Sequence, residues 1–195
     1  MSFCHFSSVV MMVVCLVSTA STQIIMTTGQ AMKLAFPDCK IQRSTVLLNQ
    51  SKQTAIEKIC GQKIRKSMVF PYVATRKGQL VGTAWFDVHK VRSKKQLLMV
   101  VLDPQQNVQR VELLAFAEPK KYQPPKRWLR KFNKQKLGGA QAGKDVPRIT
   151  GATLSVRASA LCVQRTMALH RVVFGPPAKA KATPRKKPPA KNATL

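Results

Sequence analysis

The stretch Gln96–Asp103 reads Q-L-L-M-V-V-L-D, a continuous apolar run between two polar ends. A short run of this kind is typical of a strand that is buried on both faces. A turn follows over Pro104–Asn107, and Val108–Phe116 then alternates apolar residues with polar ones such as Arg110 and Glu112. Together these segments predict a β-hairpin whose first strand lies at the centre of a sheet.

A second hairpin precedes the first one along the chain. Met68–Thr75 is apolar and favours a strand, and Leu80–His89 would place Trp85 and Phe86 on opposite faces of the next strand. Between them, Arg76–Gln79 reads R-K-G-Q and predicts a tight turn. The four strands would then follow one another as an antiparallel meander.

Three segments have the pattern of helices. The first runs from a cap at Asn49 or Ser51 to about Cys60, and the second, Lys126–Phe132, follows two prolines. The longest, Leu154–Val173, repeats apolar residues along one side. The predicted fold class is therefore α+β: a single domain with an antiparallel sheet of at least four strands flanked by helices.

The two ends of the 195-residue chain differ in composition from its centre. Residues 1–20 contain the apolar run Val9–Val17 and end in small residues, which predicts a signal peptide cleaved after Ala20. The alternatives are an uncleaved anchor and a misassigned start codon. Residues 175–195 hold five prolines and six basic residues but no acid, so we expect a disordered tail. The domain would occupy residues 33–174.

The chain is strongly basic, with 34 Lys and Arg against 7 Asp and Glu and a formal net charge of +27. This charge favours anionic partners. Basic pairs interleaved with Tyr122, Trp128 and Phe132 could contact phosphates and stack on bases, so one hypothesis is a nucleic-acid or anionic-surface binding protein without a cofactor. The export signal and the lack of a known nucleic-acid-binding motif argue against nucleic acid.

Three cysteines lie outside the predicted leader: Cys39, Cys60 and Cys162. Three thiols allow at most one internal disulfide, for which Cys39 and Cys60 are the plausible pair, although Cys60 and Cys162 also fit the pattern of small buried hydrophobes. The chain has no C-x-x-C motif and no Cys/His cluster with metal-ligand spacing, which disfavours a cytochrome or a zinc protein.

The segment Ile149–Ser155 reads I-T-G-A-T-L-S and stands directly before the longest predicted helix. Gly151 and Ala152 would let an anionic group approach the backbone closely. Thr153 lies where the first N–H groups of a helix starting near Leu154 have no helical partner. A helix N-terminus of this kind is suited to bind a phosphate group.

Polar neighbours of this segment favour the same interpretation. The hydroxyls of Thr150 and Ser155 lie within one turn of Thr153, and Arg148 and Arg157 would stabilise a phosphate charge together with the helix dipole. The same residues also fit an ordinary helix entry, in which Thr150 or Thr153 is the N-cap and no ligand binds.

The segment resembles the Ser/Thr-Gly-Ala-Thr-x-Ser/Thr signature of the FMN-binding domain family, in which a dedicated transferase links FMN to the last Thr of the core through a phosphodiester. Gly78 and Gly82 match glycines of the family's hairpin, and the two strands that follow match its sheet. Three further segments look like a soluble, exported branch of the family: D-V-H-K-V-R (Asp87–Arg92), A-F-A-E-P-K-K-Y (Ala115–Tyr122) and R-W-L-R-K-F (Arg127–Phe132).

The resemblance implies an exported electron-transfer protein related to the flavin-bearing subunits of the Rnf and Na+-pumping NADH:quinone reductase complexes. Thr153 would carry covalent FMN, and Glu118 and His89 would be candidates for proton donors near the flavin ring. The full set of expected cofactor-binding residues is Thr150, Gly151, Ala152, Thr153, Leu154 and Ser155, with Glu118, Arg148, Arg157 and His89 as further candidates. Pro147 stands where many members have Asp.

The resemblance also implies the partners. These are an FMN transferase and redox donor and acceptor proteins. The net charge favours acidic partners, the basic tail favours association with an anionic membrane surface, and the leader predicts a periplasmic or otherwise exported protein. We expect an electron carrier, acting alone or as a redox component of a larger oxidoreductase system. The alternative is a flavin-dependent reductase, for which the sequence shows no substrate-binding constellation.

Overall fold

The computed structural model describes residues 22–176, so the predicted leader and nearly all of the predicted tail lie outside the described residues. The described part contains a six-stranded sheet in which every neighbouring pair is antiparallel. In spatial order its strands are β1 (Gln23–Ile24), β8 (Val108–Phe116), β7 (Lys95–Leu102), β6 (Gln79–Lys90), β5 (Tyr72–Arg76) and β2 (Lys40–Arg43). A second, two-stranded sheet pairs β3 (Val46–Leu47) with β4 (Met68–Val69).

Helices surround this sheet and confirm the predicted α+β class. They are α1 (Thr28–Ala35), α2 (Gln50–Cys60), α3 (Lys126–Leu129) and α4 (Thr153–Phe174), with the short 3-10 helices η1 (Lys120–Tyr122) and η2 (Arg130–Phe132). None of the helices within residues 22–176 combines the length and the apolar character that crossing a bilayer requires.

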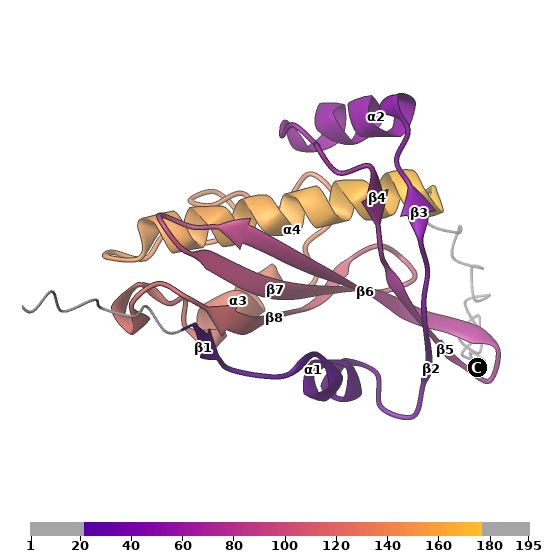
Figure 1. The fold of residues 1–195 in the computed structure, drawn as a ribbon, viewed down its shortest axis with the longest axis horizontal. Helices are drawn as coiled ribbons and strands as arrows, with labels where there is room; N and C mark the ends of the chain where they lie inside the picture. Colours follow the sequence, from indigo (N-terminus) through magenta and orange to yellow (C-terminus); the bar gives the residue numbers. More distant parts are fainter. Residues whose placement is uncertain (1–21, 177–195) are drawn as a thin grey trace, which may run out of the picture.

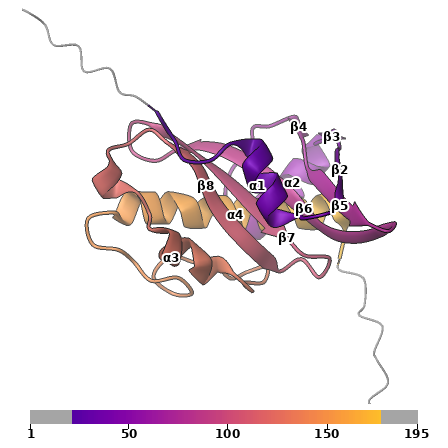
Figure 2. The same ribbon diagram turned by 90° about the horizontal axis from the view of Figure 1, so that it is seen from below.

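Different helices cover the two faces of the six-stranded sheet. The long helix α4 lies along one face, α1 lies across the other, and α2 lies on the outer side of α4 (Figure 1 and Figure 2). Because α1 has 8 residues and α4 has 22, the face under α1 is covered over a shorter length than the face under α4.

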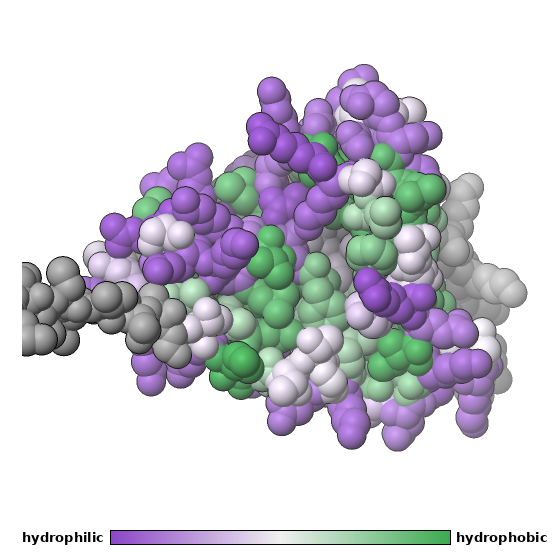
Figure 3. Space-filling view, viewed as in Figure 1, coloured by the Kyte–Doolittle hydropathy of each residue, from purple (hydrophilic) through white to green (hydrophobic). Residues whose placement is uncertain are grey.

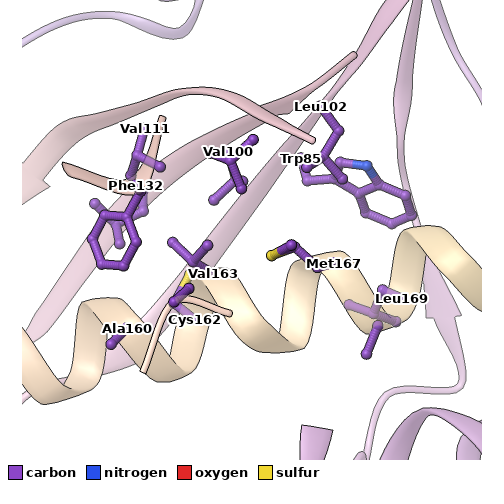
Figure 4. Close-up of a cluster of buried hydrophobic side chains, with 14 of the residues drawn as sticks. Trp85, Val100, Leu102, Val111, Phe132, Ala160, Cys162, Val163, Met167 and Leu169 are labelled. Atoms are coloured by element: carbon purple, nitrogen blue, oxygen red, sulfur yellow. The ribbon is translucent and has the colours of Figure 1, made fainter. Parts of the chain in front are cut away.

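The hydrophobic core is therefore divided by the sheet into two parts. Val163 and Met167 of α4 point towards Val100 and Leu102 of β7 in the larger part, as Figure 4 shows. Met99 and Val101 of the same strand, together with Phe36 beyond α1, belong to the smaller part on the other face.

The predicted central strand is confirmed by its burial. The five residues Leu98–Leu102 of β7 are each 0% exposed, and their side chains alternate between the two cores. The predicted meander is also confirmed, as β5, β6, β7 and β8 pair in chain order.

One predicted strand is divided in two. Met68–Thr75 was expected to be continuous, but β4 ends at Val69 and β5 begins at Tyr72. The break contains Pro71, which has no N–H to donate to a neighbouring strand. As a result β4 leaves the main sheet and pairs with β3.

The folded unit also begins before residue 33, where the sequence placed the domain boundary. The strand β1 pairs with β8 through Gln23 opposite Phe116, and α1 begins at Thr28. Thr27 and Gln30 form a capping box at the start of α1, in which each side chain bonds the backbone of the other residue. These N-terminal residues are therefore part of the domain.

The predicted disulfide between Cys39 and Cys60 is wrong, because both are free thiols. Cys39 packs against the core under α1, whereas Cys60 packs against the core under α4. The sheet thus separates the two sulfur atoms. Cys162 is fully buried, in agreement with its interpretation as a small hydrophobe.

The imidazole of His170 is buried near the C-terminal end of α4. Its Nδ1 lies 3.1 Å from Thr83 Oγ1, and this hydroxyl also accepts a hydrogen bond from Trp85 Nε1 at 3.2 Å. Thr83 Oγ1 can donate its proton to Nδ1 when the ring is neutral and carries its own proton on Nε2. Burial lowers the pKa of His170 from 6.5 to about 4.

This neutral histidine predicts a pH dependence of stability. Between pH 6.5 and 4 the unfolded chain binds a proton at His170 that the folded protein does not bind, so the free energy of unfolding should fall as the pH is lowered through this range. Urea unfolding of wild type and His170→Leu at pH 7 and pH 5 tests this. The fall should be smaller in the variant, and an equal fall in both proteins would contradict the assignment.

The glycine at position 82 is required by close packing between strands. A Cβ atom there would lie 2.6 Å from the carbonyl oxygen of Leu102 and 3.2 Å from the ring of Phe36. We expect Gly82→Ala to lower the free energy of unfolding by about 1 to 3 kcal/mol, because β6 must move away from β7. The control is Gly29→Ala in α1, where a Cβ has no neighbour within 4 Å. If both substitutions have the same effect on the urea midpoint, the close contact does not determine stability.

Candidate functional site

Thr153 lies at the start of α4 but does not cap the helix. The N-cap is Ala152, which makes no side-chain capping bond, and α4 begins at Thr153, one residue before the predicted start. Gly151 has a φ of 80°, a left-handed conformation that glycine adopts without strain. The alternative in which Thr150 or Thr153 is the N-cap is therefore not what the structure has.

The hydroxyl of Thr153 is exposed at this helix end. Its one hydrogen bond among residues 22–176 is donated to the carbonyl oxygen of Ile149 at 3.3 Å, so the oxygen lone pairs are free to react. Thr150, in the preceding turn, and Leu154, which is 49% exposed, lie on the same open end of the helix.

Two hollows meet at Thr153. The first, of about 150 Å³, is named here the Arg92 hollow, and the second, of about 370 Å³, the Arg148 hollow. The Arg92 hollow is lined by Arg92, Tyr122, Gly151, Ala152, Thr153, Leu154 and Ser155. The Arg148 hollow is lined by Gln141, Ala142, Arg148, Thr153, Val156, Arg157, Ala160, Leu161 and Gln164.

The Arg92 hollow contains an unpartnered hydroxyl. Ser155 is 1% exposed, and its Oγ has no hydrogen-bond partner within the described residues. An unsatisfied buried hydroxyl is costly, so a ligand atom or a water that bonds Ser155 would be stabilised there. On the opposite wall the guanidinium of Arg92 lies 4.8 Å from the ring centroid of Tyr122. The cationic side chains of Arg92 and Lys121 lower the pKa of the Tyr122 phenol.

A glycine in the link that leads to the motif lies against Arg148, which lines the Arg148 hollow. Gly143 has a φ of 87°, and a Cβ atom there would lie 2.6 Å from Nε of Arg148. The guanidinium of Arg148 therefore lies against the backbone of this link. Arg157, one turn into α4, lines the same hollow.

The electrostatic character of this helix end is positive. The first turn of α4 contains no acidic residue, and arginines line both hollows at Thr153. The unpaired N–H groups of the helix N-terminus add a partial positive charge. The arrangement can hold an anionic group at Thr153.

Glu118 binds the backbone of the turn between β6 and β7, which contains Arg92. Its Oε1 accepts hydrogen bonds from the backbone N–H groups of Lys94 and Ser93, each at 2.7 Å, and of Arg92 at 3.2 Å. These bonds, led by that of Lys94, lower the pKa of Glu118. Glu118 thus remains ionised and fixes the turn between β6 and β7 that carries Arg92. With Arg92 and Tyr122 it also lines an open hollow of about 680 Å³.

His89 lies in a different environment. Its Nδ1 is 3.0 Å from Asp87 Oδ1 and its Nε2 is 2.6 Å from Gln96 Nε2, while Gln96 also donates to Ser159 Oγ at 3.1 Å. Both ring nitrogens are therefore engaged, and neither hollow at Thr153 is lined by His89. The structure does not bring His89 together with the other candidate residues.

Asp87 is the centre of a buried ion network that the sequence did not reveal. Its carboxylate lies 2.8 Å from Arg165 of α4, 3.3 Å from Lys66 and 3.0 Å from His89. Burial alone would raise the pKa of Asp87, but the bond from His89 and the charges of Arg165 and Lys66 hold it well below its usual range. The network attaches α4 to β6.

Asp87, His89 and Cys162 also bring three potential metal-ligand atoms within 4.8 Å of one another. The charges of Arg165 and Lys66 already neutralise Asp87, and burial raises the pKa of the Cys162 thiol, which remains protonated. These residues favour an ion pair between helix and sheet over a cation site.

Two of the three aromatic residues that were candidates for base stacking are buried. Trp128 is 4% exposed and Phe132 is 0% exposed, and their rings pack edge to face. Trp128 Nε1 donates to the carbonyl oxygen of Pro147 at 2.6 Å, which holds the chain just before the motif. Tyr122 alone of the three has a partly exposed ring.

Of the residues predicted from the sequence, the structure thus brings most together at the start of α4. Those that line the two hollows are Gly151, Ala152, Thr153, Leu154, Ser155, Arg148 and Arg157. Arg92 and Tyr122 also line the Arg92 hollow, although Arg92 was not predicted for the site and Tyr122 was a candidate only for stacking. Glu118, which the sequence did single out, positions Arg92 by accepting a hydrogen bond from its backbone N–H.

Comparison of the chain with models of known protein families and with curated proteins found no match.

The network around Asp87 predicts that substitutions of its residues lower the free energy of unfolding by different amounts. Asp87→Asn leaves the guanidinium of Arg165, whose side chain is 18% exposed, without a counter-charge, so the free energy of unfolding should fall by about 3 to 5 kcal/mol. Lys66 is 50% exposed, and Lys66→Met should cost only about 0 to 1 kcal/mol. Urea denaturation at pH 7 measures both. If Asp87→Asn is no less stable than Lys66→Met, the network does not hold α4 to the sheet.

Proposed function

We propose that this protein is an exported FMN-binding electron-transfer protein in which FMN is linked to Thr153 by a phosphodiester. The observation that carries the proposal is the exposed hydroxyl of Thr153 at the start of α4, between two arginine-lined hollows. The likeness of its segment to the flavin-attachment signature adds the identity of the group.

The residues around Thr153 fit a phosphate ester. The phosphodiester keeps one negative charge, which the N-terminus of α4 and the guanidinium groups of Arg148 and Arg157 would stabilise. Ser155 Oγ, buried and unpartnered, would donate a hydrogen bond to a phosphate oxygen. No side chain has to be displaced from the helix N-terminus, because α4 has no side-chain cap.

The protein would supply binding and electrostatics to the bound cofactor. FMN supplies the redox chemistry, which is the transfer of one or two electrons. Arg92 and Tyr122 would face a group attached at Thr153 from the hollow between the β6–β7 turn and η1. Positive charge from Arg92, Arg148 and Arg157 would favour an anionic state of the bound group. Glu118 would hold Arg92 in place through the backbone of its turn.

The location and the partners follow from the ends and the charge of the chain. The apolar segment within residues 1–20 supports export, and 34 basic residues against 7 acidic ones support acidic redox donors and acceptors. Association with such partners would weaken as the ionic strength rises. We propose the role of a carrier, with an FMN transferase as the partner that attaches the cofactor.

The intact mass of the protein tests the attachment. Co-expression with an active flavin transferase should add the mass of one FMN less one water to wild type, and Thr153→Ala should have the bare polypeptide mass, because it lacks the hydroxyl that is esterified. Thr54→Ala is the control, since it removes an exposed threonine hydroxyl of α2 that lines neither hollow, and it should keep the added mass. A bare wild-type mass, while the same transferase modifies a known acceptor protein, would refute the proposal.

A further inference from the structure

The strand β6 is paired along only part of one edge. On the side of β5 its pairing ends where Tyr72 lies opposite Ala84, whereas on the side of β7 it continues to Lys90 opposite Lys95. On the N-terminal side of Pro71 the chain leaves the edge of β6, and β4 pairs with β3 instead. Within residues 22–176, the segment Trp85–Lys90 therefore has no strand on this side.

A hollow of about 390 Å³ lies along this edge and is named here the edge groove. Its floor is apolar and buried, with Trp85 and Leu169 each 4% exposed, and Phe86 and Leu97 form a wall on the other face of the sheet. Phe70 and other apolar residues of the β4 segment surround its mouth. Figure 3 shows a continuous hydrophobic area, coloured green, across the middle of this side of the molecule, with hydrophilic residues around it.

Two cationic side chains stand at the mouth of the edge groove. The guanidinium of Arg43 lies 4.2 Å above the ring of Phe70, and the side chain of Lys66 is 50% exposed. The carboxylate of Asp87 also lines the groove and pairs with Lys66 at 3.3 Å and with Arg165 at 2.8 Å, so that two cations share its single negative charge and Arg43 has no acidic partner among the groove residues. The mouth therefore has a net positive charge above an apolar floor.

We propose that the edge groove binds an anionic amphiphile, a molecule with one carboxylate or phosphate head and an apolar tail. Ligand sites in proteins are concave, mostly apolar and provided with a few polar groups that fix the ligand, and the edge groove has this character and a suitable volume. Arg43 and Lys66 hold the head, and the tail lies against Trp85, Phe86 and Leu97 along the open edge of β6.

This site is separate from Thr153. Leu169, on the groove floor, is 16 residues further along α4, or about 24 Å along the helix axis. Binding in the edge groove thus does not depend on a group attached at Thr153, and the proposal goes beyond the function assigned to that residue. Thr153→Ala should bind the amphiphile as wild type does.

Isothermal titration with dodecanoate, kept below its critical micelle concentration, tests the proposal. Wild type should bind one molecule, and Arg43→Gln/Lys66→Gln should bind about tenfold more weakly, because the head loses both cationic contacts. The matched control is Lys126→Gln/Arg127→Gln, which neutralises two exposed cations outside the groove. Its affinity should equal that of wild type.

The tail contacts have a test of their own. The emission of Trp85 should change on binding, and Leu97→Asp, which places a negative charge on the groove wall, should abolish binding. Dodecyl maltoside, a neutral amphiphile with the same tail, and inorganic phosphate, a head without a tail, should each bind at least about tenfold more weakly than dodecanoate.

Three results would overturn the proposal. The first is no saturable binding of dodecanoate by folded wild type, and the second is equal loss of affinity in the groove and control variants. The third is saturable binding of an extended acidic peptide with none of dodecanoate, which would make the open edge of β6 a site for a protein strand instead.

Discussion

Burial of α4 against the central strands is the interaction on which the rest of the structure depends. Val163 and Met167 pack onto β7, and β7 has residues that are fully buried on both of its faces. The helix is also attached through Arg165 to Asp87 of β6. Because α4 is fixed along its length, its first residue, Thr153, has a defined place beside the β6–β7 turn, and the two arginine-lined hollows can form there.

The sequence predicted best those features that depend on near neighbours along the chain. The meander from β5 to β8 follows from alternating and continuous apolar runs joined by short turns, and α2 begins at the predicted cap Asn49 and ends at Gly61. The strands β1 and β2 were not predicted. They are short, and their partners β8 and β5 lie far away in the sequence, so no local pattern marks them.

The residues of the candidate site likewise fall into those that the local sequence predicts and those that it does not. The start of α4, the turn at Gly151 and the arginines on either side were predictable because they lie within a few residues of one another. Arg92 and Tyr122 come from other parts of the chain and reach the site only through the pairing of β6, β7 and β8. The unpartnered Ser155 depends on burial, and the pairing of Asp87 with Arg165 joins residues 78 positions apart. Neither has a signal in the local sequence.

The length of α4 separates Thr153 from the C-terminal end of the helix. Thr153 and Phe174 are the first and last residues of one helix, which places them about 30 Å apart and at opposite ends of the domain (Figure 1). At the far end, Arg171 and Gln106 join in a hydrogen bond of 3.0 Å, which holds the helix terminus to the turn after β7. A surface that captures the protein through the chain beyond this terminus would leave Thr153 directed away from it, open to a diffusing partner.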